Sequence, residues 1–122
     1  MVVFFKNLSN DYLELLNDNE DFNVIIQVNE STNNKIFKVH SAILRKRSLY
    51  FRNELTNINS DKNNIKTINL NHVSIEQFEI IIKYIYGGVV SLDGIDVSFI
   101  FEIMLVAYEF FLKNWENFLK LF

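Results

Sequence analysis

Residues 37–51 read FKVHSAILRKRSLYF, and this segment marks a change from a strand to helices. Phe37 and Val39 follow the two-residue period of a β-strand. Beyond the strand the period becomes helical, with one apolar turn at residues 43–44. Ser48 has the side chain of a helix N-cap, so a second short helix is expected to follow it. The segment therefore predicts a strand that is followed by two short helices.

Two further strands are predicted on either side of this segment. Residues 24–28 read VIIQV, and their β-branched content and length favour a strand. The polar residues 29–34 indicate a turn, so residues 24–28 and 35–39 are expected to form a β-hairpin. A third strand is predicted over residues 65–70. The sheet is therefore expected to consist of a hairpin plus one strand.

The clearest helix signals flank the predicted sheet. Apolar residues recur at helical spacing over residues 8–16, which predicts a short N-terminal helix. Ser74 and Gln77 have the spacing of a capping box at the start of a later helix. Gly87 and Gly88 end that helix, because glycine tolerates the left-handed conformation common after a helix terminus. We interpret this glycine pair as structural and not as a phosphate-binding loop.

The C-terminal third of the chain is rich in large apolar side chains. Asp96 or Ser98 is expected to cap a helix that carries apolar residues from 100 to 112. A last helix is predicted over residues 115–122, and we expect it to be truncated at its end. A small domain has a limited interior, so any excess of these side chains is expected to lie on a surface that another molecule covers.

The order of these elements predicts an α+β fold. We expect a small three-stranded sheet flanked by a cluster of about five helices, with an extra N-terminal helix. A chain of 122 residues fits one compact domain. We divide it into an N-terminal helix, residues 1–20, and a core, residues 21–122.

Composition excludes several classes of function. The chain has no cysteine, which rules out thiolate catalysis and zinc–thiolate or iron–sulfur sites. A formal net charge of −3 gives no overall attraction for nucleic acids or anionic lipids. The apolar N-terminal run is too short to span a membrane. We therefore expect no cofactor, no nucleic-acid partner and no membrane association.

The residues that could carry chemistry favour structural interpretations. His40 and His72 lack the neighbouring ligands of a metal site. We expect His40 to be a partly buried, hydrogen-bonded residue at the start of a helix. The basic cluster at residues 45–47 and Arg52 could bind an anion, but a solvated helix face is the preferred interpretation. No nucleophile, base and orienting group occur together, so we expect neither an enzyme nor a small-molecule substrate.

Four motifs in succession resemble those of the BTB/POZ family. They are NVII from residue 23, FxVHSxIL from residue 37, RSxYF from residue 47 and KYIYGG from residue 83. The resemblance covers roughly residues 20–120. It implies an intracellular eukaryotic domain, cytoplasmic or nuclear, that homodimerises and recruits other proteins. In this family the partner is often a cullin scaffold of a ubiquitin ligase and sometimes a transcriptional corepressor.

The resemblance suggests two sets of contact residues. For the homodimer interface they are Leu8, Tyr12, Leu16, Ser41 and Leu44. For a cullin-like partner they are Tyr50, Phe51, Ile58 and Phe111. A ubiquitin-ligase substrate adaptor is the leading interpretation. A dimerisation or oligomerisation scaffold that binds no cullin is the alternative.

Two departures from the family pattern affect the expected partner. Corepressor-binding members carry an acidic residue at the head of the first strand and a basic residue after the motif histidine. Here Asn23 and Ser41 stand at those positions, so charged-peptide capture of that type is not expected. Cullin-binding members often carry a hydrophobic-x-Glu element before the third strand. The nearest match here, residues 58–60, lacks the glutamate.

Overall fold

The computed structural model describes residues 2–110 and Leu112, with side chains described from Leu8 onward. The helices are α1 (Val2–Asp18), α2 (Ser41–Arg47), α3 (Leu49–Asn57), α4 (Ile75–Gly87) and α5 (Val97–Glu109). The strands are β1 (Val24–Asn29), β2 (Asn34–Val39) and β3 (Lys66–Leu70). The predicted α+β fold, with a hairpin plus one strand and an N-terminal helix, is confirmed.

The three strands form one mixed sheet in the order β2-β1-β3. The hairpin strands β1 and β2 pair antiparallel, with Ile26 opposite Phe37. β1 and β3 pair parallel, with Ile26 opposite Ile68. A parallel pair needs a crossover connection, which α2 and α3 supply. Because the strand order is β2-β1-β3, β2 lies at one edge of the sheet.

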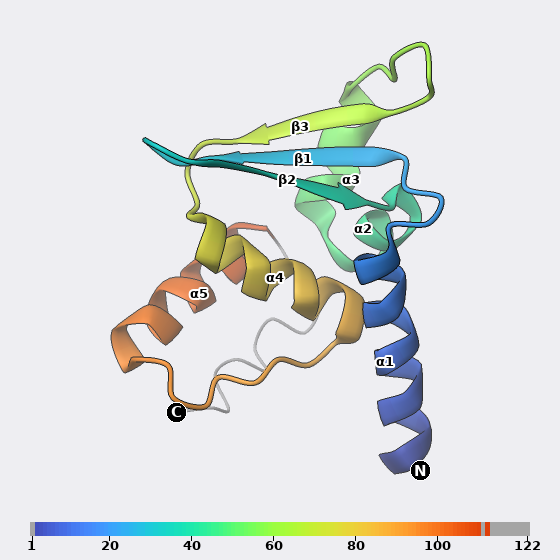
Figure 1. Cartoon of the computed structure of the whole chain (residues 1–122). Coiled ribbons are helices and arrows are strands. Elements are labelled where there is room, and N and C mark those ends of the chain that lie inside the picture. Colours follow the sequence, from blue (N-terminus) through green and yellow to red (C-terminus); the bar gives the residue numbers. More distant parts are fainter. Residues whose placement is uncertain (1, 111, 113–122) are drawn as a thin grey trace.

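One face of the sheet forms the core, and α4 covers it (Figure 1). Val24, Ile26 and Val28 alternate with less buried residues and are completely inaccessible to solvent. Phe78 of α4 packs edge-on against Phe37 of β2, with ring centroids 5.0 Å apart. Figure 1 also shows α1 at the side of the molecule, with its N-terminal end extending away from the body.

The predicted helix caps are present. Both capping-box hydrogen bonds, from Gln77 N to Ser74 Oγ and from Ser74 N to Gln77 Oε1, are 3.0 Å long. Ser48 Oγ accepts a hydrogen bond from Phe51 N at the start of α3. Gly88 follows α4 in the left-handed region, with φ of 75°.

Two predicted helix boundaries were wrong. α1 begins at Val2 and not at Leu8, because the apolar run before Leu8 contains no proline or glycine that would stop a helix. α5 ends at Glu109 and does not continue to Leu112. The reason is that Leu112 forms an antiparallel bridge with Ser48, which draws the chain out of the helix. The predicted helix over residues 115–122 lies outside the described residues.

Candidate interaction surfaces

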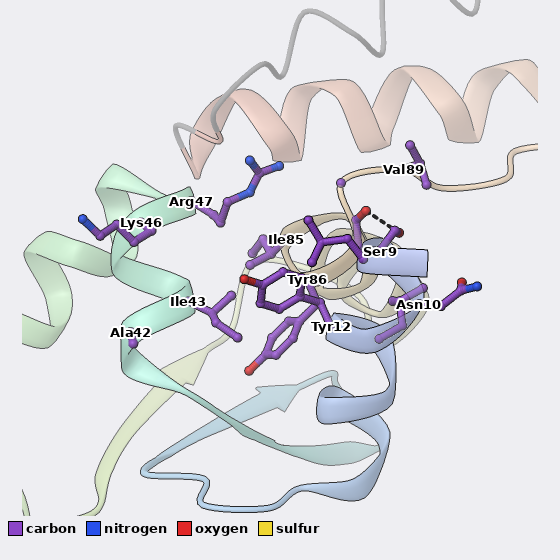
Figure 2. Close-up of a pocket in the computed structure, with 14 residues that line it drawn as sticks. Ser9, Asn10, Tyr12, Ala42, Ile43, Lys46, Arg47, Ile85, Tyr86 and Val89 are labelled. Atoms are coloured by element: carbon purple, nitrogen blue, oxygen red, sulfur yellow. Dashed lines mark hydrogen bonds between the residues drawn. The ribbon is translucent and has the colours of Figure 1, made fainter. Parts of the chain in front are cut away.

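An apolar groove of about 900 Å³ lies between α1 and α2. Figure 2 shows side chains from three helices lying in it, among them Tyr12 from α1, Ile43 from α2 and Tyr86 from α4. The end of α4 and the residues after it close one side, through Ile85 and Val89. A concave surface of mainly apolar lining is the form that a buried partner side chain or helix requires.

α1 is fixed against the end of α4 by one hydrogen bond and one close contact. Ser9 Oγ donates a hydrogen bond of 2.6 Å to the carbonyl oxygen of Gly87 (Figure 2). The side chain of Leu13 lies so close to Gly87 that a β-carbon there would be 3.0 Å from Leu13 Cγ. These contacts set the position of the α1 wall of the groove.

The outward side of α1 combines an apolar edge with acidic residues. Leu8 and Tyr12 are each 44% exposed and lie one helical turn apart. Asp11, Glu14 and Asp18 are exposed on the same helix. This helix therefore presents apolar and negatively charged side chains together.

The opposite wall of the groove, formed by α2, is basic. Lys46 and Arg47 both line the groove. The guanidinium of Arg47 also lies over the ring of Tyr84, 5.8 Å from its centroid. The α2 wall of the groove is therefore basic, whereas the α1 wall is lined by uncharged residues and the acidic residues of α1 lie outside the groove lining.

The structure separates the five residues that were predicted for a dimer interface. Leu8 and Tyr12 lie together on the groove, as required for a contact. Leu16 is half-buried and lines a different hollow, beside β2. Ser41 is half-buried at the start of α2. Leu44 is completely buried in the core, so it can support α2 from beneath but does not reach the surface.

Ser41 is hydrogen-bonded to Asn23, the residue just before β1. The side-chain nitrogen of Asn23 donates to Ser41 Oγ, and Asn23 Oδ1 accepts from the Ser41 backbone N–H, both at 2.9 Å. Asn23 thus satisfies a free donor at the start of α2. The polar groups of these two neutral residues therefore pair with each other, and the pair carries no charge.

His40 is buried just before α2 and is hydrogen-bonded through its backbone and its ring. Its backbone N–H donates to the hydroxyl of Tyr86 at 2.8 Å, and its Nδ1 lies 2.7 Å from the same hydroxyl. Its Nε2 lies 2.5 Å from the carbonyl oxygen of Glu20. A carbonyl only accepts, so Nε2 carries the hydrogen and the Tyr86 hydroxyl donates to Nδ1. Burial raises the pKa of Tyr86 above its ordinary value, although its hydrogen bond from the His40 backbone acts in the opposite direction.

The residues predicted for a cullin-like partner do not form one exposed patch. Tyr50 and Ile58 are half-buried on α3 and at its end, whereas Phe51 is completely buried. Tyr50 packs edge-on against Phe110, and burial followed by the nearby Glu54 carboxylate raises the pKa of its hydroxyl. Phe111 lies outside the described residues.

Sequence reasoning missed Leu49, which is 52% exposed at the start of α3. On α5, Leu105 is 64% exposed while Ile103 is completely buried. The apolar residues of this helix therefore divide between core and surface.

Two other kinds of site are absent from the part of the chain that the structure describes. No group of three or more His, Asp or Glu side chains is placed there to hold a metal ion. None of the described helices combines the length and the apolar character needed to cross a membrane.

Comparisons with known proteins agree on one family. A family model described as BTB/POZ domain matches residues 12–117. The solved structure titled "BTB domain of zebrafish PATZ1" superposes with a TM-score of 0.73 at 16% sequence identity, covering 99% of this chain and 92% of that one. A search of curated proteins by sequence found no match.

Proposed function

Because the chain belongs to the BTB/POZ domain family, a family of protein-interaction domains, we propose that it forms a homodimer through the α1–α2 groove. In this dimer, α1 of one copy covers the groove of the other, and the same contact occurs twice by symmetry. The observation that carries the proposal is the apolar groove of about 900 Å³ with the exposed Leu8 and Tyr12 on its α1 wall. The proposed dimer assigns the chain no catalytic activity.

Charge and size both favour a second copy as the occupant. The acidic side of α1, with Asp11 and Glu14, is complementary to Lys46 and Arg47 on α2. Such complementarity orients the partners and speeds association more than it adds affinity. The 17-residue helix α1 is about 25 Å long, enough to contribute to a stable interface of roughly 1,200 Å² in total.

Sedimentation velocity across a concentration series tests the dimer. The wild-type protein is expected to sediment as a dimer at tens of micromolar. Tyr12→Arg places a charge in the groove and is expected to yield monomers. Leu49→Arg is the matched control, because it changes an equally exposed apolar residue outside the groove and should leave the dimer intact. A monomeric wild type, or equal loss of dimer in both variants, would refute the proposal.

For the partner, we propose that the dimer recruits a cullin-type scaffold as part of a ubiquitin-ligase substrate adaptor. The support comes from the family resemblance and from Leu49, which is 52% exposed at the start of α3 next to the half-buried Tyr50. A large apolar side chain that is more than half exposed is a suitable anchor for a partner. The alternative is a scaffold that dimerises or oligomerises without a cullin.

A calorimetric titration with the N-terminal region of a cullin separates these two functions. The adaptor function is supported if the wild type binds with micromolar or tighter affinity, Leu49→Arg abolishes this binding and Tyr12→Arg retains it. If the protein sediments as a dimer but does not bind the cullin region at high concentration, the scaffold function without a cullin is supported instead. Because the dimer is measured independently, failure of the cullin proposal does not affect the dimer proposal.

A further inference from the structure

The edge strand β2 has an open hydrogen-bonding side. Glu30 N donates to Asn33 O at 2.8 Å, which closes the hairpin. In an antiparallel pair the hydrogen-bonded positions alternate. With the observed register, Lys35, Phe37 and Val39 therefore bond to β1. The residues between them, at 34, 36 and 38, direct their backbone N–H and C=O groups away from the sheet.

A contact at one end of β2 supports this assignment. With its carboxamide turned to satisfy its neighbours, Asn19 donates from its side-chain nitrogen to the carbonyl oxygen of Lys38 at 3.2 Å. The Lys38 carbonyl therefore points away from β1, as the alternation requires. The backbone of Ile36 lies at the centre of the open side, and its side chain is 55% exposed.

A second hollow, of about 460 Å³, runs along this open side between β2, α4 and the end of α1. Leu16, Phe37 and Ile82 give it apolar walls. Its charged lining residues are Lys35, Lys38, Lys83 and Glu79. Lys35 and Glu79 form an ion pair of 2.7 Å, which leaves an excess of two positive charges in the lining.

We propose that β2 binds an extended acidic peptide segment of a partner protein, which adds to the sheet as a fourth strand. The open backbone groups at 34 and 36, with the N–H of Lys38, would form the hydrogen-bond ladder, as in other cases of strand addition. The Lys38 carbonyl already accepts from Asn19. Side chains alternate along a strand, so one set would enter the hollow. Carboxylates of the peptide would lie near Lys38 and Lys83.

The charge of the edge argues against a second copy of this chain as the occupant. Pairing β2 with β2 of another copy would gather Lys35, Lys38 and Lys83 from both chains at one seam. Lysines on an edge strand oppose such self-pairing. An acidic segment instead complements the excess charge.

The probe is a blocked seven-residue peptide, Glu-Val-Glu-Val-Glu-Val-Glu, labelled for fluorescence anisotropy. We expect it to bind the full chain at low salt, whereas the same peptide with lysine in place of glutamate should not bind. Two further peptides carry N-methyl groups on alternate amides, either the odd or the even positions. A strand directs alternate N–H groups to opposite edges, so one of these two peptides, and not both, should lose binding.

Protein variants locate the site. Lys38→Glu with Lys83→Glu should weaken binding by about tenfold or more, because like charges then meet in the groove. Lys62→Glu is the net-charge control for Lys38→Glu alone, because each changes the charge by two units. Lys62 is exposed in the loop before β3, so its substitution should have little effect. Ile36→Pro removes an outward N–H that β1 does not use, and should abolish binding while circular dichroism remains unchanged.

Three outcomes would overturn the proposal. One is equal weakening by Lys62→Glu and by Lys38→Glu alone, which would indicate attraction by net charge. Another is binding of both methylated peptides at the affinity of the parent. The third is that the wild-type protein is a dimer without peptide and that Ile36→Pro makes it monomeric. The edge of β2 would then bind a second copy of the chain.

Discussion

Gly87, the last residue of α4, lies in direct contact with Leu13 of α1. A β-carbon added at Gly87 would be between 3.0 and 3.2 Å from three carbon atoms of the Leu13 side chain. The Gly87 carbonyl also accepts the hydrogen bond from Ser9. Because α1 forms one wall of the groove, this contact with Gly87 helps to set the groove's shape.

Gly87→Ala is therefore expected to destabilise the fold despite the higher helix propensity of alanine. The added methyl group displaces Leu13, at a cost of about 1 to 2 kcal/mol in the free energy of unfolding. In a Leu13→Ala background the clash is absent, and the same change should be neutral or stabilising by up to about 1 kcal/mol. Urea unfolding of the four proteins measures this coupling. Equal effects in both backgrounds would contradict the contact.

Tyr86→Phe removes one hydroxyl that bonds to two buried atoms of His40. The His40 backbone N–H and Nδ1 then lack this partner, and a buried polar group without a partner costs about 1 to 3 kcal/mol. We expect a loss of that size in urea unfolding at neutral pH.

Ionisation of the same hydroxyl makes the free energy of unfolding depend on pH in the alkaline range. Burial raises the pKa of Tyr86 in the folded state above the value of about 10 in the unfolded chain. The unfolded state therefore loses its proton first, so this contribution is complete below pH of about 10 and is lost as the pH rises beyond it. Unfolding measured between neutral and strongly alkaline pH should show a steeper loss for the wild type than for Tyr86→Phe.

Asn23→Ala removes the acceptor at the start of α2 and is expected to cost about 1 kcal/mol, the typical value of a helix cap. Asn23→Asp keeps an oxygen for the Ser41 N–H and places a negative charge at a helix N-terminus, which is favourable. Thermal unfolding should therefore show a lower midpoint for the alanine variant and a near wild-type midpoint for the aspartate variant.

Local signals in the sequence predicted local structure well. The capping box at Ser74 and Gln77, the cap at Ser48 and the helix stop at Gly88 all involve residues that are close in the chain. Their hydrogen bonds follow from side-chain type and spacing. The strand order and the parallel pairing of β1 with β3 were not predicted, because they depend on contacts between distant segments.

The candidate site was only partly predictable for the same reason. The groove is assembled from residues 8–13, 42–47 and 85–89, which are far apart in the sequence. Leu44 and Phe51 belong to the recognised motifs, but the inner faces of α2 and α3 bury them completely. In such short apolar helices, periodicity alone does not show which residue faces the core. Leu49, which is exposed, was missed for that reason.

The central claim is that α1 of one copy meets α2 of another, and a charge exchange tests it most directly. One variant makes α1 basic (Asp11→Lys, Glu14→Lys), and the other makes α2 acidic (Lys46→Glu, Arg47→Glu). In each variant alone, like charges meet across the interface, which is costly. In an equimolar mixture, every α1–α2 contact again joins opposite charges.

Sedimentation velocity of the two variants, separately and mixed, is the decisive measurement. The proposed dimer predicts monomers for each variant alone and a heterodimer in the mixture at the same total concentration. A mixture that remains monomeric while the wild type dimerises would show that the dimer does not form through these helices.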